Sequence, residues 1–154
     1  MGSRLADIFT ALAAMPVNVN GTSVPAYGLD ALPNSVAAAS LPCRLLLPLG
    51  TRVEGRSVSF ATVGTAGVVV PQWRITDLLL WKPTAQGRGL NDVAPDLIAY
   101  MAAYVDALRS TRRFAGAEVI DAAFEPSVYT YPAGGTKDYW GVEVVLQIKE
   151  IVGS

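Results

Sequence analysis

The feature that most constrains the fold is an alternation of apolar and polar residues near the end of the chain, from Tyr139 to Val152. Successive side chains of a β-strand point to opposite faces, so this pattern predicts a strand that buries one face. An extended segment from Ala117 to Tyr131 precedes it, with the turn sequence Ala133-Gly134-Gly135 between them. We therefore predict a closing antiparallel hairpin, with Tyr139, Glu143, Gln147 and Lys149 on its outer face. Its inner face is formed by Trp140, Val142, Val144, Leu146, Ile148 and Val152.

Two amphipathic helices are predicted from apolar residues at helical spacing. The first follows Ser3 as N-cap and stops at Pro16, which cannot continue a helix. Its apolar residues are Leu5, Ile8, Phe9, Leu12 and Met15. The second begins at Asp92 or Ala94, with Pro95 in its first turn, and ends in basic residues that complement the helix dipole. Its apolar stripe is Leu97, Ile98, Met101, Tyr104, Val105 and Leu108, and the basic residues are Arg109, Arg112 and Arg113.

Several strands are expected between the two helices. Asn20-Gly21 is a strong turn dipeptide, with Val24 to Tyr27 as the returning strand. Leu41 to Leu49 reads as a buried strand, and Gly67 to Trp81 as a central strand because its apolar residues occupy both faces. The segment 50–67 is expected to form a long hairpin or a flexible arm.

This order of elements predicts an α+β fold. We expect an antiparallel or mixed sheet with two helices packed on one face, plus the long hairpin or arm. At 154 residues the chain fits a single domain, 1–154, that needs no disulfide or metal for its stability.

The residues that usually carry catalysis are scarce. The chain has no histidine, which removes the commonest general base and the usual zinc ligand sets. Cys43 is the only cysteine and is expected to be a small core residue. Gly87-Arg88-Gly89 lacks the spacing of a dinucleotide or phosphate loop. We therefore expect no enzyme activity, cofactor or metal site.

Three carboxylates need separate consideration. Asp121 and Glu125 lie four residues apart in a predicted strand, so both could face one side as an acid/base pair or as two solvated charges. Asp77 interrupts an apolar strand, and a buried carboxylate needs a partner. We expect an ion pair with Arg74 or with an arginine of another subunit, in packing or at an interface.

Composition points to contact between subunits. Charged residues make up 16% of the chain, against about 25% in an average protein, and hydrophobic residues make up 51%. A subunit interface would cover the surplus apolar surface, and the alternative is a monomer with an alanine-rich surface. The net charge of −1 and the absence of a basic run argue against nucleic-acid binding, and no segment is long enough to span a membrane.

Three segments together resemble the small tail-terminator, or tail-completion, proteins of long-tailed bacteriophages. The first is the strand and loop Trp73-Arg-Ile-Thr-Asp-Leu-Leu-Leu-Trp-Lys-Pro, and the second is the helix from Asp92 to Arg113. The third is the closing hairpin, with Phe124-Glu-Pro-Ser-Val before the turn and Tyr139-Trp-Gly-Val-Glu-Val-Val-Leu-Gln-Ile-Lys-Glu after it. The resemblance covers most of the chain and rests on the order of elements, without an invariant motif.

The resemblance implies a structural virion protein, assembled in the host cytoplasm. Such proteins form a ring of identical subunits, usually six, that caps the head-proximal end of the tail tube and joins tail to neck. The implied partners are other copies of the chain, the tail tube protein and a neck or head-completion protein. A head-completion or neck connector subunit is the alternative within this setting. The alternative from a different class is a small-molecule-binding domain or a cryptic enzyme that uses Asp121, Glu125 or Asp77.

Candidate interface residues come from the two long loops and from the aromatic residues. We expect the 50–67 arm and the 82–90 loop to contact neighbouring subunits or the tube, so that deleting residues 52–65 abolishes the ring and leaves a folded monomer. We expect Trp73 and Trp140 in the core. The interface candidates are Arg52, Glu54, Arg56, Asp77, Trp81, Lys82, Arg88, Tyr129 and Tyr131.

Overall fold

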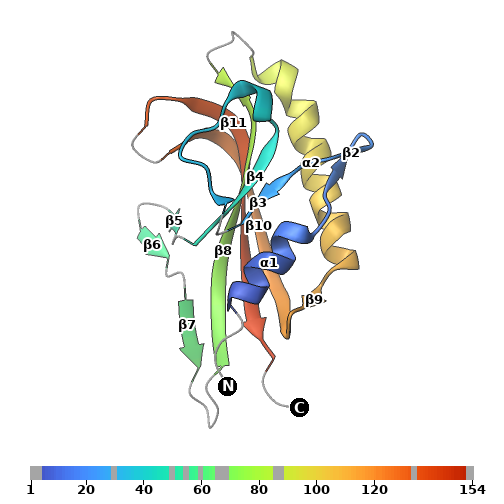
Figure 1. Cartoon of the computed structure of the whole chain (residues 1–154), viewed down its shortest axis with the longest axis vertical. Coiled ribbons are helices and arrows are strands. Elements are labelled where there is room, and N and C mark those ends of the chain that lie inside the picture. Colours follow the sequence, from blue (N-terminus) through green and yellow to red (C-terminus); the bar gives the residue numbers. More distant parts are fainter. Residues whose placement is uncertain are drawn as a thin grey trace.

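A computed structural model of the protein shows two helices on a mixed sheet, an α+β fold as predicted (Figure 1). The structure describes residues 5–28, 31–48, 51–53, 56–58, 61–64, 70–84, 89–132 and 135–151. The helices are α1 (Leu5–Ala14) and α2 (Leu90–Ser110), with a 3₁₀ turn η2 (Ala38–Ser40). The large sheet contains β3 (Ala26–Tyr27), β4 (Cys43–Leu47), β7 (Ala61–Gly64), β8 (Val70–Pro83), β9 (Arg113–Phe114), β10 (Ala117–Thr130) and β11 (Asp138–Glu150).

The strands of the large sheet run in the order β3-β4-β8-β11-β10-β9, and β7 also pairs with β8. Strand β8 is central, as its two apolar faces predict, with β11 on one side and β4 and β7 on the other. Among the described pairs, β3 with β4 is parallel and the others in this sheet are antiparallel. The fold is therefore a largely antiparallel sheet with crossover connections and one short parallel edge.

The predicted closing hairpin is present as β10 and β11, paired from Ala117 with Glu150 to Thr130 with Asp138. A shift of register between Val119 and Asp121 marks a β-bulge in β10. The inner-face residues from Val142 to Ile148 are buried as predicted, and Trp140 packs against the core while remaining partly exposed. Tyr139 differs from the prediction, because it is buried in a second apolar cluster on the other face.

Helix α1 buries Ile8, Phe9 and Leu12 and ends before Pro16, as predicted, while the predicted N-cap Ser3 lies outside the described residues. Helix α2 begins at Leu90, earlier than either predicted N-cap, and Pro95 lies inside it. Its N-cap is Gly89, which has no side chain that could cap the helix. The predicted stripe is wrong at Ile98, which is 64% exposed. The buried residues are instead Val93, Leu97, Tyr100 and Tyr104.

Residues 17–27 form a small hairpin and then rejoin the sheet. Strands β1 (Asn18–Val19) and β2 (Thr22–Ser23) pair across Asn20 and Gly21, whose φ angles of 53° and 84° suit a tight hairpin turn. The predicted return strand from Val24 to Tyr27 is wrong. The return strand is β2, while β3 pairs with β4 of the large sheet.

The predicted 50–67 arm divides into two parts. Strands β5 (Thr51–Val53) and β6 (Arg56–Val58) form a separate two-stranded hairpin. Strand β7 joins β8, so this part of the predicted arm belongs to the main sheet. A deletion of residues 52–65 would therefore remove a sheet strand as well as the hairpin.

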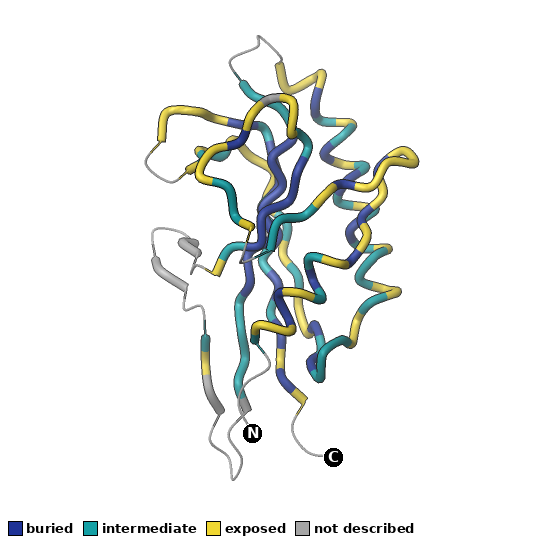
Figure 2. Tube along the Cα trace, viewed as in Figure 1, coloured by how far each residue is buried: buried dark blue, intermediate teal, exposed yellow. Residues whose placement is uncertain are grey.

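The sheet carries an apolar cluster on each face, and buried residues concentrate on its central strands (Figure 2). The larger cluster joins both helices and the first hairpin to one face, so the helices share a face as predicted. The smaller cluster lies on the opposite face, where the segment 27–41 contributes Tyr27, Leu32, Val36 and Leu41. The other buried members of this second cluster are sheet residues: Cys43, Leu45, Leu78, Leu80 and Tyr139.

Candidate functional site

A fully buried ion pair joins two neighbouring strands under the helices. Arg44 lies on β4 and Asp77 on β8, and both side chains are 0% exposed. Arg44 Nη2 lies 2.6 Å from Asp77 Oδ2, while Nε donates to the two carboxylate oxygens at 3.1 Å and 3.4 Å. The planar guanidinium is suited to this two-point contact with a carboxylate.

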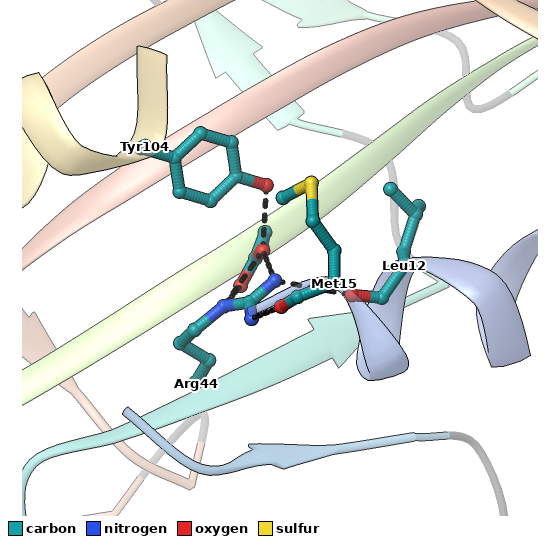
Figure 3. Close-up of polar contacts among 5 residues, drawn as sticks. Leu12, Met15, Arg44 and Tyr104 are labelled. Carbon is teal, nitrogen blue, oxygen red and sulfur yellow. Dashed lines mark hydrogen bonds and ion pairs between the residues drawn. The ribbon is translucent and has the colours of Figure 1, made fainter. Parts of the chain in front are cut away.

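The remaining donors of Arg44 reach the end of α1 (Figure 3). Nη1 donates to the carbonyl oxygen of Met15 at 2.8 Å, and Nη2 to that of Leu12 at 3.2 Å. The last carbonyls of a helix lack intrahelical partners and carry partial negative charge. Arg44 therefore satisfies the end of α1 and fixes this helix to the sheet.

Two tyrosines of α2 approach the same charges. The Tyr104 hydroxyl donates to Asp77 Oδ2 at 2.6 Å, and the Arg44 guanidinium carbon lies 5.6 Å from the centre of its ring (Figure 3). Tyr100 is equally buried, but its hydroxyl has no hydrogen-bond partner among the described residues. The network therefore links α1, α2, β4 and β8 through one carboxylate.

The electrostatics keep the charges of this network fixed. Burial lowers the pKa of Arg44, but the charge and hydrogen bond of Asp77 outweigh it and leave this pKa above its ordinary value. Burial, followed by the charge of Asp77, raises the pKa of the Tyr100 and Tyr104 hydroxyls. The arginine thus remains charged and the tyrosines neutral across the physiological range. Because these side chains are sealed from solvent, the arrangement is suited to holding elements together.

Asp77 is therefore a packing ion pair, one of the two roles predicted for it. The predicted partner is wrong, because Arg44 occupies the place expected for Arg74. Arg44 was missed as a site residue, although it interrupts an apolar strand as Asp77 does. Two opposite charges in two buried neighbouring strands are the sequence signal that would have identified the pair.

The other predicted interface residues have different surroundings. Trp81 was expected to be partly exposed but is buried, and its indole N–H donates to Asp96 of α2 at 3.3 Å. Lys82 is half-buried near the end of β8. The side chains of Arg52, Glu54, Arg56 and Arg88 lie outside the described residues.

Tyr129 and Tyr131 are half-buried and make hydrogen bonds within the chain. The Tyr131 hydroxyl donates to the carbonyl oxygen of Pro33, which ties the hairpin to the covering segment. The Tyr129 hydroxyl donates to the carbonyl oxygen of Glu125 and accepts from the Glu143 N–H at 3.3 Å. It thus bridges β10 and β11 where these two glutamates are paired.

Asp121 and Glu125 are both exposed on β10, which agrees with two solvated charges. In the described part of the chain, no group of acidic, cysteine or histidine side chains could hold a metal ion. Cys43 is buried as predicted, and burial raises the pKa of its thiol to about 11. This thiol is therefore protonated at neutral pH and unsuited to act as a nucleophile.

The most distinctive surface feature is the outer edge of β10. Strand β9 pairs only with Ala117 and Glu118, and Val119 N–H bonds to the carbonyl oxygen of Arg112. From Ile120 to Thr130, no described strand pairs with this edge. Ile120 and Val128 on this stretch are 44% and 41% exposed. An open edge with exposed apolar side chains is a template for another strand.

Neither described helix is long and apolar enough to cross a membrane. Comparisons of the chain with protein-family models, curated proteins and solved structures find no match.

Proposed function

We propose that the protein is a structural virion component that caps the head-proximal end of a phage tail tube. In this role it forms a homo-oligomeric ring, with six subunits, and joins the tail to the neck. The proposal starts from the resemblance of the strand 73–83, the second helix and the closing hairpin to tail-terminator proteins. The α+β fold supports it, because the first and third segments form β8 and the β10–β11 pair of one sheet, and the second forms helix α2.

The observation that carries the proposal is the open edge of β10. A long edge that no described strand pairs with, and that exposes Ile120 and Val128, is a liability for a protein that acts alone, although Pro126 within it has no N–H to donate. Natural monomers protect such an edge with charged side chains, proline, bulges or a covering element. On this stretch β10 has Asp121, Glu125, Pro126 and a bulge, but no lysine and no covering strand among the described residues. A subunit of a ring protects it by contact with its neighbour.

The three carboxylates considered for chemistry from the sequence also favour a role in contacts. Asp77 is committed to Arg44 and Tyr104 inside the core. Asp121 and Glu125 lie on the exposed strand, beyond the apolar clusters. This distribution supports a scaffold whose function is carried out by its surfaces.

The mass of the purified chain in solution, followed by negative-stain imaging, tests the proposal. The expected result is a multiple of the 16.2 kDa chain and a ring with a central hole. Adding the ring to tubes made from the tail tube protein of the same virus should then label one end of each tube. A monomer at every concentration would contradict the proposal, and a ring that binds a head-completion protein but no tube would place it in the neck.

A further inference from the structure

The open edge of β10 raises the question of which strand occupies it. The free stretch from Ile120 to Thr130 is long enough to accept a strand of ordinary length. Addition of an extended segment to a sheet edge is a common mode of recognition, in which main-chain hydrogen bonds supply affinity.

The same chain contains a two-stranded hairpin, β5–β6, that is separate from the large sheet. Strands β5 and β6 pair with each other, and no described strand of the large sheet pairs with them. An isolated two-stranded hairpin is at best marginally stable in water. Its backbone groups would gain partners by joining a sheet edge.

Charge argues against two copies of β10 pairing with each other. The free stretch of β10 carries Asp121 and Glu125 and no basic residue. Glu118 is already engaged by Arg112 and Arg113, at 3.0 Å and 3.7 Å. An antiparallel β10–β10 contact would bring like charges together, which destabilises cross-strand pairs.

The hairpin sequence has the complementary charge. Residues 51–58 contain two basic residues, Arg52 and Arg56, and one acidic residue, Glu54, which gives a net charge of +1. Opposite charges across an interface select the partner and disfavour the alternative pairing.

The hairpin and the free edge lie on opposite sides of the sheet. Strands β5 and β6 follow β4 and precede β7, and both of these pair with β8 on the side away from β11 and β10. In Figure 1, β5 and β6 are drawn on the opposite side of β8 from β9. A contact between two different patches on opposite sides runs head to tail, and such contacts form a ring when the rotation between subunits closes.

We infer that the β5–β6 hairpin of one subunit adds to the free edge of β10, from Ile120 to Thr130, in the next subunit. The same contact repeats between each pair of neighbouring subunits, so the inference rests on the proposed ring. The occupant is a second copy of this chain, and the side chains that flank the joint include Ile120 and Val128.

Crosslinking between two variants that each add one cysteine to the chain tests the joint directly, because the native Cys43 is buried. Chains carrying Ser57→Cys on β6 are mixed with chains carrying Ala123→Cys, whose residue is exposed at the centre of the free edge. After reassembly, a short bis-maleimide should produce covalent dimers that contain one chain of each kind. The matched control pairs Ser57→Cys with Ala102→Cys, an exposed position on α2, and should produce none.

Edge variants provide the second test. Ile120→Lys with Val128→Lys places lysines on the free edge, which should convert the ring to a folded monomer with an unchanged near-ultraviolet circular dichroism spectrum. Replacing residues 51–58 by a Gly-Ser linker, with β7 kept, should have the same effect. The control Ile98→Lys alters an exposed apolar residue of α2 and should leave the ring intact.

The outcomes separate this inference from the proposed function. If the unmodified chain forms a ring, yet the β6–β10 crosslink is absent and both edge variants still form rings, the joint is wrong and the ring proposal stands. If the unmodified chain is a monomer, both are wrong. A chain carrying both Ser57→Cys and Ala123→Cys that crosslinks only within itself, without covalent dimers, would place the hairpin on its own β10 edge and overturn the inference.

Discussion

Arg44 and Asp77 meet at 2.6 Å in the centre of the molecule, and neither side chain reaches water. Removing two charges from water is unfavourable, and the attraction offsets this only when the geometry is good and the other hydrogen-bonding groups are satisfied. Here the carboxylate also accepts from Tyr104, and the guanidinium also donates to the end of α1. The pair therefore depends on four elements being correctly placed, and it specifies their arrangement.

Neutralising one partner of this pair should be strongly destabilising. Asp77→Asn keeps the shape of the side chain but leaves the Arg44 charge buried without compensation. We expect a loss of about 3–5 kcal/mol in the free energy of unfolding, measured by urea denaturation. The matched control is Asp106→Asn, which removes an exposed ion pair with Arg109 and should have no measurable effect.

Removing both charges should be less harmful than removing one. The double variant Arg44→Met with Asp77→Leu leaves no unpaired charge, although the carbonyl oxygens of α1 lose a donor and the Tyr104 hydroxyl loses its acceptor. We expect it to be more stable than Asp77→Asn alone in the same urea experiment. A double variant less stable than the single one would mean that the helix contacts of Arg44 outweigh its pairing with Asp77.

The two buried tyrosines of α2 should respond differently to loss of the hydroxyl. Tyr104→Phe removes a 2.6 Å hydrogen bond to a carboxylate and should destabilise the protein by about 1.5–3 kcal/mol. Tyr100→Phe removes a buried hydroxyl that has no hydrogen-bond partner among the described residues, and it should be neutral or stabilising. Thermal unfolding of the two variants side by side checks this. Equal losses would show that the Tyr100 hydroxyl also serves the network.

Much of the fold could be predicted because its signals are local. The alternation in β11, the apolar run of β8 and the helical spacing in α1 each depend on neighbouring residues. The turn at Asn20 and Gly21 was predictable for the same reason, since its dipeptide favours positive φ angles. The errors in α2 are also local: Ile98 was placed on the buried stripe, but it follows Leu97 around the helix and points outward.

The site could not be predicted to the same extent because its contacts are distant in sequence. Arg44 and Asp77 are 33 residues apart, and their proximity depends on β4 pairing with β8. The nearby Arg74 is a more obvious partner from sequence alone. The burial of Trp81 has the same origin, since α2 covers it and Asp96 supplies its hydrogen bond. The free edge of β10 follows from strand order, which periodicity does not give.

Gly141 should be intolerant of any side chain. A Cβ atom added there would lie 2.0 Å from the carbonyl oxygen of Leu79, a backbone atom of the neighbouring strand. The position adjoins the irregularity between Trp140 and Gly141 in the β8–β11 ladder, so relief of the clash requires separating two central strands. We expect Gly141→Ala to destabilise the protein by at least about 3 kcal/mol, the upper end for overpacking.

Gly28→Ala is the control for this substitution. Its added Cβ would meet only Ala13 Cβ, at an ordinary contact distance of 3.7 Å. The two variants are compared by chemical denaturation and by the yield of soluble protein. Similar stabilities for the two would mean that β8 and β11 separate at this position at little energetic expense.

The paired glutamates of the closing hairpin should make stability depend on pH. Glu125 and Glu143 are directly opposite on β10 and β11. Burial, followed by the charge of Glu125, raises the pKa of Glu143 above its usual value. A raised pKa means that the folded protein holds the Glu143 proton more tightly than the unfolded chain does. The resulting stabilisation is complete below the unfolded value of about 4.3 and is lost as pH rises through the folded value.

Glu143→Gln should therefore stabilise the protein at neutral pH and have no effect in acid. The amide removes the like-charge contact with Glu125 and the partial burial of a carboxylate, so we expect a gain of roughly 0.2–1 kcal/mol at pH 7. The gain should shrink as pH falls and vanish below about pH 4. The hydrogen bonds of Tyr129 are unaffected, because its hydroxyl contacts the Glu125 carbonyl oxygen and the Glu143 N–H. Urea denaturation across this pH range measures the effect. A gain that is constant with pH would attribute it to packing and not to the charge of Glu143.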